Sequence, residues 1–121
     1  MKHLLIIDDD ATFKETLKAC IDTGKYTYAL AADGIEGLKS VEEERPDLIL
    51  LDVMMPNMDG IAFLKELNKK YGEGVIPVLI TSNSSSMDTI SEGVTLGIRG
   101  YVVKANESLQ GICNSIDHVL Q

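Results

Sequence analysis

Cysteine, tryptophan, proline and long apolar runs are all scarce in this chain. It has two cysteines, no tryptophan and three prolines among 121 residues. Cys20 and Cys113 lie far apart, with no second Cys or His at ligand spacing, so we expect two reduced, buried thiols. The longest apolar runs span about six residues, too few to cross a membrane, and the first ten residues lack the layout of a signal peptide. These features predict a cytoplasmic protein.

Positive charge is scarce as well. The 11 Lys and Arg residues against 19 Asp and Glu residues give a formal net charge of −8. Because no stretch gathers Lys and Arg into a patch, we expect no direct contact with nucleic acid. The acidity suits a protein that meets cations or basic partner surfaces. The length suits one domain with one hydrophobic core, and we expect residues 1–121 to form it.

Five short apolar runs alternate with segments of helical spacing. The runs are continuous rather than alternating, as in strands covered on both faces. They occupy Leu4–Ile7, Tyr26–Ala31, Leu48–Leu51, Val75–Ile80 and Tyr101–Val103. Helical spacing marks Phe13–Ile21, Ile35–Val41, Ile61–Leu67, Ile90–Leu96 and Leu109–Val119. This order predicts an α/β fold, a parallel sheet with helices on both faces.

Polar residues follow four of the five predicted strands, at the edge where open α/β sheets bind ligands. In chain order they are Asp8, Asp9, Asp10, Asp52, Thr81, Ser82 and Lys104. Three carboxylates, a hydroxyl and an ammonium group should therefore converge on one edge of the sheet.

Some of these residues have ordinary structural explanations. Asp10 directly precedes a helical segment, so its expected role is to cap that helix. One cap needs one acid, which leaves Asp8 and Asp9 unexplained. Asp52 ends a run of buried leucines, where an unpaired carboxylate would be costly. Ser82 alone is weak evidence, because a serine at a strand end is often only a loop residue.

The balance of charge predicts a metal ion. Lys104 alone cannot neutralise three carboxylates. An all-oxygen site selects a hard cation such as Mg²⁺ over a softer one.

Four segments resemble the motifs of response-regulator receiver domains, the chemotaxis-protein-like switches of two-component signalling. They are Leu4–Asp10, Asp52–Gly60, Pro77–Ser82 and Gly100–Lys104. The resemblance covers the whole chain, in order. It implies a flavodoxin-like, doubly wound, five-stranded parallel sheet of order 2-1-3-4-5. In that order the switch point lies between the strands that end at Asp8 and Asp9 and at Asp52.

The resemblance also implies a metal-dependent phosphoacceptor site. Asp52 would be the nucleophile that attacks phosphorus. Asp9, Asp52 and the backbone carbonyl of Met54 would bind Mg²⁺, with Asp8 acting nearby through water. No general base is needed, because a carboxylate is ordinarily ionised near neutral pH.

Further residues would sense and tune the phosphoryl group. The resemblance implies that Lys104 contacts it, that Ser82 bonds it after transfer, and that Tyr101 then turns inward. The positions associated with its lifetime are Met54, Asn83 and Ser84.

The sequence departs from the family pattern at these positions. Ala105 follows the lysine where proline is usual, and a cis bond there would cost about 2.5–4 kcal/mol. Asn83 stands where Ala or Gly is usual and adds bulk near the phosphoryl group. Met54 and Ser84 offer no carboxylate or amide to align a hydrolytic water.

The implied function is a phosphorylation-dependent switch, which catalyses only its own phosphorylation and dephosphorylation. Its partners would be a sensor histidine kinase or a phosphotransfer protein. The output would pass through the region 87–120 to a partner or an attached effector domain.

Three alternatives stay open. A dehalogenase-type phosphatase would use Asp8 as nucleophile and Asp10 as acid/base, but only Glu107 and Asp117 follow Lys104 where that family expects an acidic motif. A receiver-like module that never uses phosphate is disfavoured by the complete set of acids, hydroxyl and lysine. A flavodoxin is disfavoured because its flavin phosphate needs N–H groups and hydroxyls where this chain is acidic.

Overall fold

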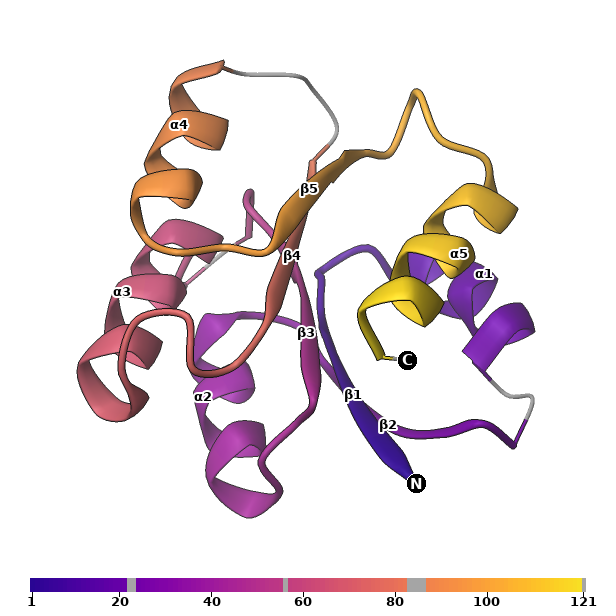
Figure 1. Ribbon diagram of the computed structural model, residues 1–121, viewed down its shortest axis with the longest axis horizontal. Helices are drawn as coiled ribbons and strands as arrows, with labels where there is room; N and C mark the ends of the chain where they lie inside the picture. The colour runs from indigo at the N-terminus through magenta and orange to yellow at the C-terminus, as the bar shows by residue number, and fades with distance from the viewer. Residues whose placement is uncertain (22–23, 56, 83–86, 121) are drawn as a thin grey trace.

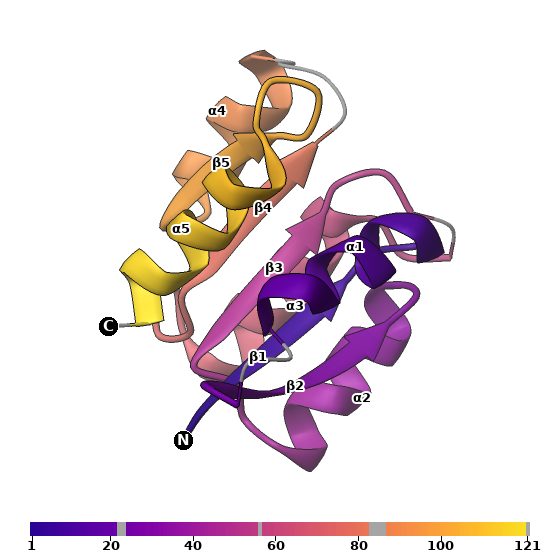
Figure 2. The same cartoon turned by 90° about the vertical axis from the view of Figure 1, so that its right-hand side faces the viewer.

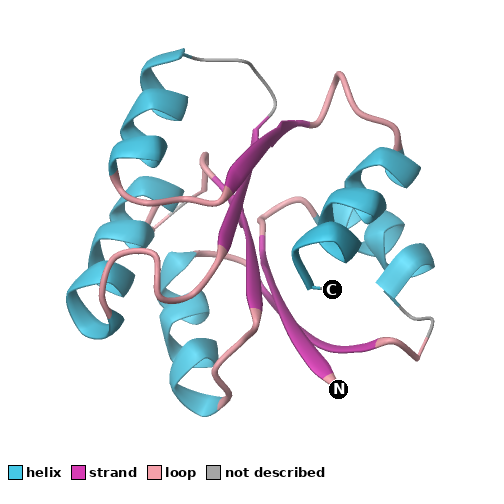
Figure 3. Cartoon of the chain, viewed as in Figure 1, coloured by secondary structure: helices cyan, strands magenta, loops and turns pink. Residues whose placement is uncertain are grey.

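The computed structural model describes residues 1–21, 24–55, 57–82 and 87–120 (Figure 1). Strands and helices alternate through that part of the chain (Figure 3). The strands are β1 (Lys2–Ile7), β2 (Tyr26–Ala31), β3 (Leu48–Asp52), β4 (Val78–Ser82) and β5 (Gly100–Val103). The helices are α1 (Ala11–Ile21), α2 (Gly34–Glu43), α3 (Gly60–Tyr71), α4 (Met87–Thr95) and α5 (Leu109–Leu120).

The strands form a parallel sheet in the order β2-β1-β3-β4-β5, which confirms the predicted topology. Helices α2, α3 and α4 cover one face of the sheet, and α1 and α5 cover the other (Figure 1). Figure 2 shows the sheet from the side of α1 and α5, with the strands fanned by their twist. The carboxyl ends of all the strands therefore lie along one edge.

Burial on both faces explains the continuous apolar runs. Along β1, Leu4 and Ile6 pack with residues of α1 and α5, whereas Leu5 and Ile7 pack with residues of α2 and α3. All four side chains are at most 1% exposed. A strand between two helical layers buries both sets of side chains, so its sequence shows no polar alternation.

The fourth strand begins later than its apolar run. The run was expected to start at Val75, but β4 begins at Val78. Pro77 has no N–H group for a sheet ladder, although its carbonyl accepts a hydrogen bond from the Ile49 N–H at 2.9 Å. Ile76 still packs in the core, where it is 4% exposed. The apolar character of this residue therefore reflects its burial and not a place in the strand.

Cys113 corrects one expectation. Its side chain in α5 is 5% exposed, as expected, but it is disulfide-bonded rather than a free thiol. Spacing along a chain does not reveal which residues meet across packed helices, and that proximity decides whether a disulfide can form. The side chain of Cys20 lies outside the described part of the structure.

No helix within the described ranges is both long and apolar enough to cross a membrane.

Candidate functional site

The acidic residues gather where β1 and β3 end side by side. These strands pair in parallel with Ile7 opposite Leu51, so Asp8 and Asp52 end neighbouring strands. Carboxylate oxygens of Asp8, Asp9 and Asp52 all lie within 4.8 Å of one another. Asp8 and Asp52 are 0% and 3% exposed, whereas Asp9 faces solvent. Two buried carboxylates and one exposed one thus form a cluster of oxygen ligands open on one side.

Asp8 is held from both sides. Its Oδ2 atom accepts a hydrogen bond from Lys104 Nζ at 2.7 Å, and its Oδ1 atom accepts one from the Asp10 N–H at 2.8 Å. Its own N–H donates to the Ala31 carbonyl at 3.0 Å. A buried carboxylate is tolerated when it is paired and hydrogen-bonded, so the lysine accounts for the burial of Asp8.

Lys104 lies between Asp8 and an aromatic ring. Its side chain is only 10% exposed. Its Nζ atom lies 4.2 Å from the centre of the Phe13 ring in the first turn of α1, within the range of a cation–π contact. The sequence singled out Lys104, but no local signal identified Phe13 as its neighbour.

The lysine reaches the site through a trans peptide. Among the described residues there is no cis peptide bond, so the bond between Lys104 and Ala105 is trans. The backbone is fixed by the Lys104 N–H, which donates to the Ser82 carbonyl at 2.7 Å, and by a turn in which the Asn106 N–H donates to the Val103 carbonyl at 3.0 Å. The loop therefore avoids the penalty of a cis bond before alanine.

The electrostatics of the cluster centre on Asp52. The pKa of its carboxyl is raised from 3.8 to about 7. Burial is the largest cause, and the negative charge of Asp8 and a hydrogen bond with the Asp9 side chain act in the same direction. The charge of Lys104 and the Met54 N–H lower this pKa, but by less. A cation among these oxygens would favour the ionised form of Asp52.

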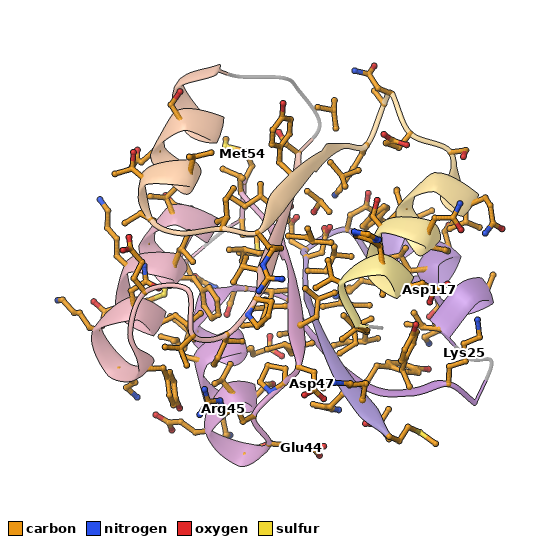
Figure 4. The ribbon with its side chains drawn as sticks, in the orientation of Figure 1. Lys25, Glu44, Arg45, Asp47, Met54 and Asp117 are labelled. Atoms are coloured by element: carbon orange, nitrogen blue, oxygen red, sulfur yellow. The ribbon has the colours of Figure 1, made fainter. Side chains whose placement is uncertain are left out.

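The loop after β3 is tied down at several points. The Gly60 N–H donates to the Val53 carbonyl at 2.9 Å, and a Cβ atom on Gly60 would lie 2.4 Å from the Asp52 carbonyl oxygen. This position therefore needs glycine. Met54, between these points, is 77% exposed and lies near the upper end of the sheet in Figure 4.

A second tie joins this loop to α2. Asn57 adopts a left-handed backbone conformation with φ of 65°, which asparagine tolerates better than most residues. Its Nδ2 atom donates to Asp33 Oδ2 at 2.7 Å, while Asp33 Oδ1 caps α2 by accepting from the Glu36 N–H at 2.9 Å. The hydrogen bond from the Glu36 N–H, and then that from the Asn57 side chain, hold the pKa of Asp33 below its usual value. The sequence analysis missed this link; an Asn within a predicted loop was its only signal.

The remaining candidates lie at β4, β5 and beyond. Ser82 is the last residue of β4 and is partly exposed, and Tyr101 in β5 is 51% exposed. Asn83 and Ser84 lie outside the described residues. Asp10 caps α1 as expected, since its Oδ1 atom accepts from the Phe13 N–H at 3.1 Å.

Sequence comparison identifies the class of protein. Residues 4–116 match the response regulator receiver domain, and the chain belongs to that family. The family assignment decides against the phosphatase and flavodoxin alternatives.

Individual relatives agree with this assignment. Response regulator MprA of Mycobacterium ulcerans is 33% identical over 102 residues, which are 84% of this chain and 43% of that protein. MprA of Mycobacterium leprae is also 33% identical, over 84% of this chain and 44% of that protein. The chain thus spans less than half the length of these curated relatives.

Solved structures show the same architecture. The chemotaxis protein CheY4 of Vibrio cholerae superposes with a TM-score of 0.88 at 27% identity, covering 98% of both chains. The receiver domain of Francisella response regulator 1452 gives a TM-score of 0.86 at 28% identity, covering 98% of this chain and 96% of that one.

Proposed function

We propose that this receiver domain accepts a phosphoryl group on Asp52 in a Mg²⁺-dependent reaction and thereby switches its surface for a partner or an attached output domain. The observation that carries the proposal is the convergence of Asp52 with Asp8, Asp9 and Lys104 at one edge of the sheet. The phosphoryl donor is a sensor histidine kinase or a phosphotransfer protein.

The donor set suits a hard cation. Three carboxylates with one paired lysine leave excess negative charge, and every ligand atom is oxygen. Asp9, Asp52 and the Met54 carbonyl would hold Mg²⁺, with Asp8 nearby. The bound ion would supply positive charge to the equatorial oxygens of the transferring group, whose stabilisation dominates phosphoryl transfer.

The chain's own residues perform the transfer. A carboxylate oxygen of Asp52 forms a bond to phosphorus as the bond from phosphorus to the donor imidazole nitrogen breaks. The electron pair goes to that nitrogen, and because the donor ring carries a proton on its other nitrogen, the histidine leaves as neutral imidazole. Asp52 attacks as an anion, and Lys104, which contacts Asp8 and Phe13, would pair with the incoming group.

The consequence of phosphorylation is a change of surface rather than turnover of a substrate. Ser82 ends β4, and Tyr101 lies on the neighbouring strand β5. A movement of Ser82 toward the phosphoryl group could therefore be passed directly to the Tyr101 ring. The output surface is the region 87–120, and Met54, Asn83 and Ser84 set how long the phosphoryl group lasts. Such a switch works in the cytoplasm, beside the kinase.

The direct test is labelling with a small phosphodonor. Phosphoramidate or acetyl phosphate with Mg²⁺ should add one phosphoryl group to the wild type, mapped to Asp52. The Asp52→Asn variant should stay unlabelled under the same conditions. Labelling of this variant at the wild-type level would refute the proposal, and so would labelling of Asp8 instead of Asp52.

A further inference from the structure

Thr81 carries a buried hydroxyl that makes no hydrogen bond to the rest of the described structure. The residue is 1% exposed, and its Oγ1 atom has no hydrogen-bond partner among the residues that the structure describes. Buried hydroxyls are normally hydrogen-bonded, and an unsatisfied one destabilises the folded state. A valine would fill the same space in a strand without that cost.

The sheet register places Thr81 beside Asp52. β3 and β4 pair in parallel with Asp52 opposite Thr81, so the two side chains emerge next to each other on the same face. That face is the one covered by α1 and α5, because Leu50 and Leu79, two residues before Asp52 and Thr81, belong to its core.

A further donor would help to orient the Asp52 carboxylate during phosphoryl transfer. One of its oxygens must attack phosphorus while the other keeps the group oriented. Lys104 Nζ donates to Asp8 Oδ2 at 2.7 Å, and the Asp52 carboxyl interacts with the Met54 N–H and the Asp9 side chain. The Thr81 hydroxyl can supply a neutral donor from the neighbouring strand by rotation about a single bond.

We propose that Thr81 is a positioning residue for Asp52, whose hydroxyl donates a hydrogen bond to the non-attacking carboxylate oxygen during phosphoryl transfer. This role rests on the proposed function of Asp52. It is separate from that of Ser82, the next residue, whose side chain belongs to the opposite face of the strand. Thr81 acts on the nucleophile, whereas Ser82 is expected to act on the transferred group.

The test compares two pairs of variants that differ by one hydroxyl. Wild type against Thr81→Val is the first pair, and Thr81→Ser against Thr81→Ala is the second. The rate constant of labelling by phosphoramidate at saturating Mg²⁺ should fall roughly three- to tenfold on loss of the hydroxyl in each pair. Thr81→Ser should keep a rate near that of the wild type.

Stability should change in the opposite direction. The thermal midpoint of Thr81→Val should rise by about 3–6 °C, because an unsatisfied buried hydroxyl is replaced by a methyl group. A variant that is both more stable and slower cannot owe its slowness to a damaged fold. If Thr81→Val fails to fold, the comparison of Thr81→Ser with Thr81→Ala decides the question.

Two results would overturn the role of Thr81 while leaving that of Asp52 intact. One is a labelling rate in Thr81→Val within twofold of the wild type. The other is a Thr81→Ser rate as slow as that of Thr81→Ala, which would assign any effect to packing of the methyl group. Failure of the proposed function itself would look different, because the wild type would then not be labelled on Asp52 at all.

Discussion

The two edges of the sheet differ in how their polar groups are paired. At the amino-terminal edge, the His3 N–H donates to Asp47 Oδ2 at 2.8 Å, and His3 Nδ1 lies 2.8 Å from Thr27 Oγ1. At the carboxyl-terminal edge, the Thr81 hydroxyl finds no hydrogen-bond partner among the described residues, and the pKa of Asp52 is raised to about 7. Figure 4 labels Asp47 at the lower edge and Met54 near the upper one.

This difference separates residues that hold the fold from residues that do chemistry. At the amino-terminal edge, the polar groups of His3, Asp47 and Thr27 pair with one another. Within the described ranges, the carboxyl-terminal edge carries unpaired charge and unused hydrogen-bonding groups. These groups lower the stability of the fold, but they can bind a cation and a phosphoryl group. Four predictions test this difference between the two edges.

Removing Lys104 should have the largest effect on stability. Lys104→Met leaves the buried Asp8 without its cation, and breaking such a pair should lower the free energy of unfolding by about 4 kcal/mol at pH 7. Asp47→Asn at the opposite edge is the control and should cost about 1 kcal/mol or less. Urea unfolding measures both; equal losses would erase the contrast between the edges.

Removing the charge of Asp52 should instead stabilise the metal-free protein. Its folded-state pKa of about 7 lies above the usual value of 3.8, so the native state holds a proton that the unfolded state releases. Stability should therefore fall as the pH rises from about 4 to 7, by about 3 kcal/mol in total.

Asp52→Asn should flatten this pH dependence and exceed the wild type in stability at pH 8. Unfolding titrations in EDTA at several pH values give the comparison. A wild-type stability that rises between pH 4 and 7 would contradict the electrostatics of the cluster.

Mg²⁺ should relieve the same repulsion. With a dissociation constant near 1 mM, 10 mM Mg²⁺ would stabilise the native state by about 1.4 kcal/mol, seen as a rise in thermal midpoint. The rise should vanish in Asp9→Ala, whose carboxylate is exposed and contributes little to the core. A midpoint in the wild type that ignores Mg²⁺ would count against the metal site.

The smallest effect concerns the lifetime of the phosphoryl group. Met54 is exposed and apolar, so it cannot align a water for attack on phosphorus. Met54→Asn should speed the decay of phosphorylated protein by a few-fold, about 1 kcal/mol or less in the barrier. Asn83→Ala should not slow the decay. Slower decay in both variants would show that these side chains assist hydrolysis.

The sequence predicted the fold and the meeting of the charged residues because both follow from strand ends. Apolar runs identified the strands, and parallel strands must end at one edge, which brings Asp8, Asp52 and Lys104 together. The disulfide of Cys113 and the contact of Phe13 with Lys104 could not be predicted. Both depend on which side chains from distant elements meet in space, and no spacing along the chain encodes that.

The hydrogen bond between Asn57 and Asp33 suggests how the conformational change on phosphorylation can be followed by fluorescence. It fastens the loop beside Asp52 to the first turn of α2, so that helix and loop should report as one body. A fluorophore on the exposed side of α2 then serves as a fixed reference. A second fluorophore near Tyr101 in β5 would report the movement of the output surface on phosphorylation. The distance between the two dyes becomes a real-time measure of the phosphorylated fraction.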